Sequence, residues 1–426
     1  MNLSNVFVLI FLAGTAFSFL LNFFLEKIDF SFRQKHGREI PEKLKDFVDF
    51  QTLDKTCQYE DAKFRLWLPS MILDTILSLY LVWCGFYPAV FTRVWSWTGN
   101  SFWATLLFLI IVSIPGAILS VPFALYDEFG IEKHFGFSNM TLPMWIMDTL
   151  KSLFLSLVIA LPLLGAMIAL FKYASEWWWL LLGCVYVLFS FVISILYPLF
   201  IAPLFNKFTP LEDGELKTRL ESLLAKCGFT ASGLFVMDAS KRSGHSNAYF
   251  TGFGKSKRVV LYDTLIEQLS VDEIEAVLGH ELGHYKHHHI IKKMCVMVPL
   301  IFAVLFAISF LVKLPYLYEG FGFDAGEEVP FQMMAVGVFL LGLIFEGFSD
   351  LSQLVGNFFS RKDEFQADAF SKNICGGGEH LISALIKLNK ENLSEIQVPK
   401  IYSAFNYSHP PLLERIGALE EKKRAE

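Results

Sequence analysis

The sequence lacks paired cysteines. Its six cysteines are scattered without a C-x-x-C pair, and several fall in apolar stretches, which argues against a disulfide scaffold and a thiolate metal site. Charged residues are also scarce, since Asp, Glu, Lys and Arg make up 18% of the chain and the formal net charge is −6. No region concentrates Lys and Arg among aromatic residues as a nucleic-acid groove would, so we expect no nucleic-acid partner.

Repeats and low-complexity tracts are absent as well, and we expect no cleavable leader. The apolar run at residues 6–24 has no basic start and no small-residue cleavage site, so we interpret it as a retained first membrane span. Apolar residues, by contrast, account for 54% of the chain, and Phe alone occurs 44 times. This composition predicts an all-α integral membrane protein that crosses the bilayer several times.

Apolar stretches of spanning length recur along the chain and predict about seven transmembrane helices. Beyond residues 6–24 they lie at about 66–91, 102–125, 150–171, 177–205, 291–312 and 331–359. The predicted regions are a membrane region at 1–205 with five spans and a cytosolic loop at 26–65, a cytosolic insert at 206–290, a transmembrane hairpin at 291–359 and a cytosolic C-terminal region at 360–426. Basic residues cluster in the long loops but not at 319–328, so the positive-inside rule places the N-terminus outside and those loops in the cytosol.

The stretch from Ser270 to His284 is predicted to form one helix that carries the chemistry. Ser270 and Glu273 have the spacing of a capping box, which marks the start of the helix. His280 and His284 lie one turn apart, so both imidazoles can reach one cation, while Glu281 faces a water bound to it. This is the H-E-x-x-H arrangement of zinc hydrolases.

A catalytic zinc site needs three protein ligands and one open position, so a third ligand must come from elsewhere. We predict Glu364, with Asp368 one turn further on and placed to hold a ligand. Glu364 belongs to a polar stripe with steps of three and four, which comprises Glu346, Asp350, Gln353, Asn357, Arg361, Glu364 and Asp368. Because ionisable groups are costly in lipid, the stripe faces either a wet cavity or neighbouring helices through hydrogen bonds.

The insert is predicted to contain an amphipathic helix at 215–227 and strands at 234–238, 247–251 and 258–262, the last two paired around a turn at 252–257. An edge strand just ahead of a metal helix suits a protease, because an extended peptide can add to it.

Several single residues allow two interpretations. His287 to His289 fit a solvated helix end better than a metal site, and Trp177 to Trp179 fit an interfacial anchor. Arg361 either recognises a substrate carboxylate or, as we favour, pairs with Asp368. Asn247 could serve a turn or the reaction, and Asp74 in the second span is ambiguous.

Four separated blocks carry a resemblance to a known family. They are the H-E-L-G-H at 280–284, S-R-K-D-E-F-Q-A-D-A-F at 360–370, S-G-H-S-N-A-Y-F at 243–250 and Y-S-H-P-P-L-L-E-R at 407–415. In this order they resemble the type I CAAX prenyl endopeptidases, which are zinc metalloproteases of the endoplasmic reticulum and inner nuclear membranes. The similarity extends over nearly the whole chain.

The resemblance implies seven transmembrane helices around a hydrated chamber, with a cytosolic zincin-like (gluzincin) α+β metalloprotease domain. It implies one Zn²⁺ per chain, a multi-pass location with the active site toward the cytosol or nucleoplasm, and removal of the C-terminal aaX tripeptide from farnesylated or geranylgeranylated CAAX proteins. The residues that match are the ligands His280, His284 and Glu364, the base Glu281, the peptide and oxyanion positions Asn247 and His409, and the supporting Asp368, Arg361 and Asn357. Lys362-Asp363 and Ser138 depart from the family pattern without touching a ligand.

Two other classes remain as alternatives. A membrane quality-control protease like the bacterial HtpX family shares the metal blocks but has a shorter chain with fewer spans. A seven-span receptor or transporter with an incidental motif would bind no zinc. A site-2-type protease would need a Leu-Asp-Gly ligand sequence, which is absent.

Overall fold

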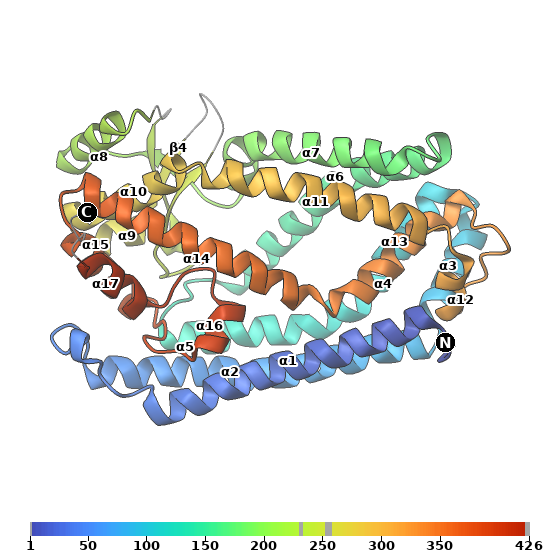
Figure 1. Cartoon of the computed structure of the whole chain (residues 1–426), viewed down its shortest axis with the longest axis horizontal. Helices are drawn as coiled ribbons and strands as arrows, with labels where there is room; N and C mark the ends of the chain where they lie inside the picture. The colour runs from blue at the N-terminus through green and yellow to red at the C-terminus, as the bar shows by residue number, and fades with distance from the viewer. Residues whose placement is uncertain (1, 230–232, 252–257, 422–426) are drawn as a thin grey trace.

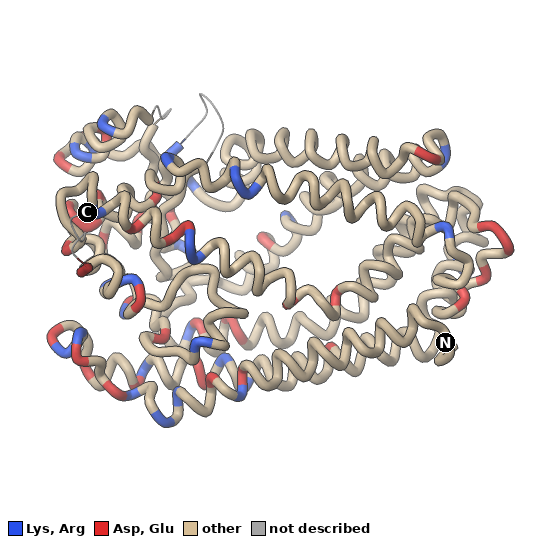
Figure 2. Tube along the Cα trace, viewed as in Figure 1, with Lys and Arg blue, Asp and Glu red and all other residues tan. Residues whose placement is uncertain are grey.

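The structure, a computed structural model, describes residues 2–229, 233–251 and 258–421; the predicted turn at 252–257 lies outside them. Long helices run lengthwise through the molecule, and the small sheet with its surrounding helices gathers at one end, opposite the N-terminus (Figure 1). The middle of the bundle is nearly free of charged residues, which collect at the two ends (Figure 2).

Six helical segments in the described part of the chain are long and apolar enough to cross a membrane, or up to seven if one bent pair is a single span. The main helices of these six segments are α1 (Val6–His36), α2 (Phe50–Trp83), α4 (Ser101–Tyr126), α6 (Leu142–Tyr173), α7 (Trp178–Leu196) and α11 (His289–Leu311). The bent pair is α13 (Phe331–Glu346) with α14 (Ser349–Ile374). Few side chains in the single spans are buried, so their apolar faces suit contact with lipid. The prediction of about seven transmembrane helices is confirmed.

Several helices extend beyond the apolar runs that predicted them. Most of 26–65, predicted as a loop, is helical, because α1 continues to His36 and α2 already begins at Phe50; a short 3₁₀ turn, η1 (Glu42–Leu44), lies between them. The predicted span 66–91 is divided between α2 and α3 (Phe86–Thr98), where Gly85 adopts φ 70°. Apolarity marks only the part of a helix that lies in hydrocarbon, and the polar ends continue it beyond the membrane.

The last predicted span, 331–359, is bent by 67° between α13 and α14. A Cβ at Gly347, in the bend, would lie 2.4 Å from the backbone carbon of Gly14, so a glycine is needed where α1 passes. The bend separates Glu346 from the rest of the polar stripe. Asp350 accepts hydrogen bonds from Ser18 and Asn22 of α1 at 2.9 and 3.0 Å, so at this position the stripe joins helices.

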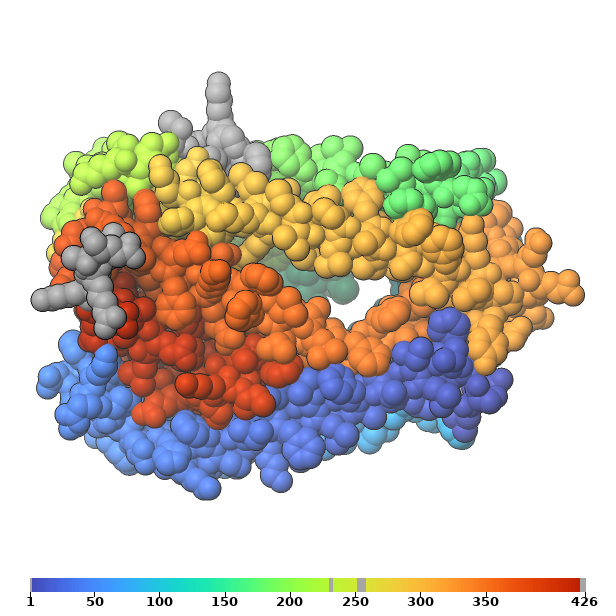
Figure 3. Space-filling view, viewed as in Figure 1, coloured from blue at the N-terminus to red at the C-terminus, as the bar shows by residue number. Residues whose placement is uncertain are grey.

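Aromatic packing closes the end of the bundle near the N-terminus. Phe108 of α4 meets Phe91 and Phe339 edge to face at 5.7 and 5.2 Å between ring centroids. Tyr318 of α12 (Pro315–Gly320) is fully buried, and its hydroxyl donates to the Val312 carbonyl at 2.8 Å. The helices enclose a chamber, and Figure 3 shows an opening between α11 and the bent pair of α13 and α14.

The chain between α4 and the sheet contains short irregular elements. They are η2 (Asp127–Glu132), α5 (Lys133–Phe135), η3 (Tyr197–Ile201) and η4 (Ala202–Leu204). η2 and η3 are π-helical, and Pro198 is the second residue of η3, which follows α7 directly. They carry the spans into the soluble end of the molecule.

The sheet has the strand order β1-β2-β4-β3. Its strands are β1 (Phe208–Pro210), β2 (Leu234–Met237), β3 (Ala248–Thr251) and β4 (Arg258–Tyr262). β2 runs parallel to β4, whereas β3 pairs with β4 antiparallel in the register Tyr249 to Val260, as the predicted pairing requires. β3 forms one edge of this sheet. A short turn, η5 (Ala239–Lys241), follows β2.

The insert and the C-terminal region also contain helices. They are α8 (Glu215–Lys226), α9 (Asp263–Gln268), α10 (Val271–Lys286), α15 (Glu379–Glu391), α16 (Lys400–Asn406) and α17 (Leu412–Glu420). Helices α8, α9, α10 and α15 pack around the sheet, whereas α16 packs against α14 and α1, and α17 against α14 and α15. Leu220 and Leu223 of α8 share one buried cluster with Leu278 and Leu282 of α10. The apolar spacing that predicted α8 and α10 is therefore the spacing of their buried faces.

Candidate metal centre

The start of α10 is defined by its cap. Ser270 Oγ accepts from the backbone N–H of Glu273 at 3.4 Å, and the Glu273 carboxylate accepts from the Ser270 N–H at 2.7 Å. This is the predicted capping box, and it satisfies two amides that the first turn would leave without partners. The side chains of His280 and His284 then lie on the helix face opposite the buried apolar cluster.

Three side chains converge between α10 and α14. His280 Nε2 and His284 Nε2 are 3.2 Å apart, and the two carboxylate oxygens of Glu364 lie 3.4 and 3.3 Å from these nitrogens. One ligand atom from each residue falls within 4.8 Å of the others. His280 and Glu364 are 7% and 4% exposed, so bulk water screens these two side chains little, whereas His284 is partly exposed.

The chemistry of this group fits a bound cation. Among the described residues Glu364 Oε2 has no hydrogen-bond partner although it is buried, a costly arrangement for a carboxylate unless a positive charge faces it. His280 Nδ1 lies 2.8 Å from Asp368 Oδ1, and a proton held there leaves a lone pair on Nε2, which faces the other ligands. Two imidazoles and one carboxylate are a donor set that suits zinc and leaves a fourth position for water.

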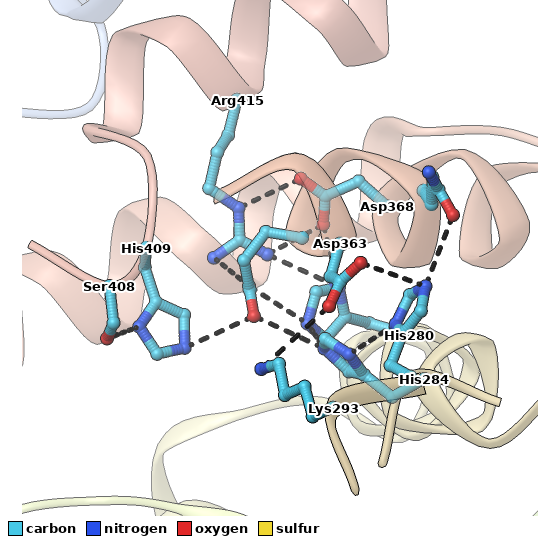
Figure 4. Close-up of polar contacts among 11 residues, drawn as sticks. His280, His284, Lys293, Asp363, Asp368, Ser408, His409 and Arg415 are labelled. Atoms are coloured by element: carbon cyan, nitrogen blue, oxygen red, sulfur yellow. Dashed lines mark hydrogen bonds and ion pairs between the residues drawn. The ribbon is translucent and has the colours of Figure 1, made fainter. Parts of the chain in front are cut away.

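Arg415 of α17 completes the support behind His280 and was not among the predicted site residues. It donates to both oxygens of Asp368, from Nε at 2.9 Å and Nη2 at 2.6 Å (Figure 4). Its Nη1 lies 4.0 Å from Glu364 Oε2. A bidentate guanidinium fixes the plane of the carboxylate that orients His280. The available signal was its position at the end of the block 407–415, which also contains His409.

His289 corrects the interpretation of the three consecutive histidines. It is 1% exposed rather than solvated, with Nδ1 at 2.9 Å from His284 Nδ1 and Nε2 at 3.2 Å from Gln366 Oε1. His288 turns the chain with φ 56°, so that His289 at the start of α11 faces back toward His284. Each histidine of the motif therefore has a partner for its second ring nitrogen.

The favoured pairing of Arg361 with Asp368 is wrong, because Arg415 takes both oxygens of that carboxylate. Arg361 Nη1 donates to the Ser403 carbonyl at 2.9 Å, and Asn357 Nδ2 donates to the Phe405 carbonyl at 2.5 Å. Both residues thus hold α16 against α14. Because the segment after α16 carries His409, these contacts affect the metal centre only through the position of that segment.

Glu281, His409 and Asn247 differ in how closely they approach the ligands. Burial raises the pKa of Glu281, and the neighbouring imidazoles of His280 and His284 oppose the rise. His409 Nε2 lies 3.5 Å from Glu364 Oε1. The side chain of His409 is exposed, and its Nδ1 contacts the hydroxyl oxygen of Ser408. Asn247 caps the start of β3 through its own Oδ1 and the Ala248 N–H at 2.8 Å, and within the described residues it makes no hydrogen bond to the ligands.

A helical membrane bundle joined to an H-E-x-x-H helix and a distant third carboxylate defines a membrane-embedded metalloprotease. Two family profiles match the chain, "CAAX prenyl protease N-terminal, five membrane helices" over residues 29–207 and "Peptidase family M48" over residues 210–423. The chain belongs to the CAAX prenyl protease 1 family of the M48 zinc metalloproteases.

Curated relatives and a solved structure agree with this assignment. CAAX prenyl protease 1 of Saccharomyces cerevisiae is 34% identical over 412 residues, which covers 91% of this chain and 90% of that protein. The homologue of Oryza sativa is 41% identical over 76% of this chain and 74% of its own length, and that of Homo sapiens is 31% identical over 92% and 90%. The crystal structure of S. mikatae Ste24p superposes with a TM-score of 0.88 and 33% identity, covering 96% of this chain and 99% of that one. The hypothesis of a receptor or transporter with an incidental motif is wrong.

Proposed function

We propose that this protein removes the C-terminal aaX tripeptide from farnesylated or geranylgeranylated CAAX proteins. The observation that carries the proposal is the convergence of His280, His284 and Glu364 at the end of a hollow membrane bundle. A peptide with an attached isoprenoid is amphipathic, so a site between lipid and water can hold both parts of it.

We assign the three converging residues as ligands of one Zn²⁺ per chain. When bound, the ion polarises the scissile carbonyl and makes water a stronger nucleophile at neutral pH. Asp368 and Arg415 keep His280 oriented, and His289 does the same for His284.

Glu281 is assigned as the general base and then the general acid. It follows the first ligand in α10, and burial raises its pKa, which makes the carboxylate a stronger base. It takes the proton of the attacking water and delivers it to the leaving amine.

His409 and Asn247 are assigned to the substrate. His409 is exposed beside Glu364, so it can donate a hydrogen bond to the oxyanion that develops on the carbonyl. Asn247 precedes β3, whose position at the edge of the sheet lets an extended peptide add as a further strand. His409→Ala is expected to lower kcat more than it raises KM.

The protein is expected in the endoplasmic reticulum membrane and the inner nuclear membrane, with the metal centre toward the cytosol or nucleoplasm. Its partners are prenylated CAAX substrates and the bilayer. The orientation follows from the basic residues at the soluble end, and the division at 1–205, 206–290, 291–359 and 360–426 remains part of this proposal.

The test is a cleavage assay on matched CAAX peptides with and without the isoprenoid, each with and without a chelator. We expect cleavage of the prenylated peptide alone, its loss with the chelator and its recovery with zinc. Equal cleavage of both peptides and of unfolded membrane proteins would favour an HtpX-like quality-control protease. Cleavage that continues in the presence of the chelator would contradict a metal-dependent mechanism.

A further inference from the structure

A cavity of about 530 Å³ lies between the membrane helices and the sheet, lined by segments from α6, η4, β1, β2 and β4. Its lining is strongly basic, although the whole chain carries a formal charge of −6. The charged residues that line it are Lys151, Lys207, Lys241, Arg242, Arg258 and Asp238. None of them belongs to the metal centre.

The cavity lies at the membrane boundary. On α6, Leu150 and Phe154 flank Lys151 and are 54% and 70% exposed, as expected for side chains that face lipid. At the other wall, Phe200 and Leu204 are 64% and 52% exposed directly ahead of the first strand. Apolar side chains therefore border the basic lining, so acyl chains and a headgroup could be accommodated together.

Acidic residues neutralise only part of the basic lining. Asp148 is shared by Lys151 at 3.3 Å and Arg242 at 2.8 Å, and Asp238 accepts from the backbone N–H of Lys207 at 2.6 Å. Five basic side chains thus face two carboxylates. The cavity keeps an excess of positive charge.

Three basic side chains have no carboxylate partner within residues 2–229, 233–251 and 258–421: Lys207, Lys241 and Arg258. Arg258 is nevertheless held in place, since its guanidinium lies 4.9 Å over the Phe235 ring and donates to the Pro198 carbonyl at 3.3 Å. Lys207 and Lys241 are exposed. A planar guanidinium held in place beside two exposed ammonium groups is an arrangement that suits phosphate oxygens.

We propose that this cavity binds the phosphate headgroup of an anionic phospholipid. Basic pockets at the cytosolic end of membrane helices attract anionic headgroups, and each Lys or Arg near such a surface adds to the attraction. The lipid is favoured over free phosphate because Phe154 and Phe200 offer acyl chains a surface beside the charges. A lipid held there would join α6 to the sheet that precedes the metal helix.

The test measures lipid binding by the full chain in detergent micelles. Short-chain phosphatidic acid is titrated against the protein, with phosphatidylcholine of the same chain length and inorganic phosphate as parallel arms, and bound lipid is read by native mass spectrometry and thermal unfolding. The variant is K207Q/K241Q. The matched control is K226Q/K292Q, which removes two exposed lysines without ion-pair partners in the described chain and changes the charge equally.

We expect the wild type to bind phosphatidic acid in preference to phosphatidylcholine. K207Q/K241Q should bind it roughly tenfold to thirtyfold more weakly, whereas K226Q/K292Q should bind as the wild type does. Equal binding of the two lipids, or equal loss in both variants, would overturn the proposal. If inorganic phosphate binds as tightly as phosphatidic acid, the cavity is a phosphate site and the lipid assignment is wrong. Unchanged thermal unfolding without lipid identifies a variant that is still folded.

Discussion

At the scale of single residues, the centre depends on what holds the second nitrogen of each ligand histidine. His280 has Asp368 and Arg415 behind it, and His284 has His289 and Gln366. A histidine whose second nitrogen is fixed presents a single lone pair in a fixed direction. These partners come from three helices, and of them only His289 is a near neighbour in sequence of the histidine that it orients.

Glu281→Gln separates metal binding from the reaction. The amide has nearly the same size but cannot take a proton from water, so we expect unchanged metal content and a kcat lowered by roughly 10²-fold to 10⁴-fold. The measurement pairs metal analysis with steady-state cleavage of a farnesylated peptide. Normal cleavage in a variant that retains its metal would remove Glu281 from the mechanism.

His289→Ala should weaken the metal site without touching a ligand. Loss of the contact at His284 Nδ1 is expected to lower metal affinity by about 10-fold to 100-fold, the usual effect of removing a residue that orients a ligand. Metal content is measured after equilibration in graded chelator buffers. His288→Asn is the control, because His288 is exposed and Asn tolerates its left-handed backbone. Equal metal retention in both variants would contradict the role of His289.

At the scale of elements, the centre depends on how closely α10 approaches α14. A Cβ at Gly283 would lie 2.7 Å from Ala367 Cα and 3.0 Å from its carbonyl oxygen, and backbone atoms cannot rotate away. The glycine between the two ligand histidines therefore sets the helix separation. Since Glu364 lies one turn before Ala367, this separation also determines its reach to the histidines.

Gly283→Ala should push the two helices apart. We expect a loss of roughly 1–3 kcal/mol in the free energy of unfolding, with reduced metal content, because the added methyl overpacks the contact. Gly356→Ala on α14 is the matched control, since its new Cβ meets no atom of the described chain within 4 Å. Thermal unfolding and metal analysis of both variants make the comparison. Identical thermal unfolding and metal content of the two variants would show that the contact at Gly283 does not set the helix separation.

The cap of α10 gives a pH-dependent prediction. Burial opposes ionisation of Glu273, but hydrogen bonds from Lys387, Ser383 and the Ser270 backbone outweigh it and lower its pKa to about 2. A carboxyl whose pKa is lower in the folded state stabilises the fold at pH values above its ordinary pKa, and this stabilisation disappears as pH falls toward 2.

Glu273→Gln should therefore unfold more readily than the wild type at pH 7, by about 1–3 kcal/mol for hydrogen bonds to a charged group. The difference should shrink between about pH 5 and pH 2, because the wild type then loses the same charge. Unfolding of both proteins is followed across this range. A difference that stays constant down to pH 2 would show that the ionised carboxylate is not the cause.

At the scale of the whole molecule, a buried ionic cluster joins the membrane region to the C-terminal region. Arg33 of α1 pairs with Asp29, with Asp61 of α2 at 2.9 Å and with Glu395 at 2.7 Å, and its side chain is 3% exposed. Glu395 precedes the segment that carries α16 and His409. The cluster thus fixes the C-terminal region against α1 and α2.

Arg33→Gln should be severely destabilising, because it leaves three carboxylates without their cation. We expect a loss of about 3–5 kcal/mol, the usual cost of breaking a buried charge pair. Arg38→Gln is the control, since its pair with Asp54 is about one-third exposed on each side and should contribute less than about 1 kcal/mol. Unfolding in detergent micelles measures both, and a similar loss in the two would mean that the cluster is well solvated.

Local pattern was sufficient to predict several features. The capping box, the helical spacing of His280 and His284, and the strand pairing around 252–257 depend on neighbours in sequence, and periodicity records such neighbours directly. The membrane spans were also predictable, because the bilayer imposes a minimum apolar length. The ends of the helices were less predictable, since α1 continues to His36 and α2 begins at Phe50, both inside the segment predicted as a loop.

Contacts between distant segments were decided by packing. Arg415 reaches Asp368 across 47 residues, and Arg361 donates to the Ser403 carbonyl instead of the Asp368 carboxylate two turns along α14. Even the near neighbour His289 meets His284 only because one left-handed residue turns the chain back. Arginine and histidine side chains have several possible partners within reach, and neither composition nor spacing shows which partner each side chain takes.

The amino-acid order alone therefore specifies a membrane-embedded metalloprotease with Glu364 as the candidate third ligand, because ligand chemistry and hydrocarbon thickness act on short stretches of chain. Only the folded molecule decides which partner each buried donor and acceptor takes, where the last span bends and which basic residues meet in one cavity. These outcomes depend on how closely α10, α14 and α1 approach one another, and that distance is set by side chains from all three helices at once.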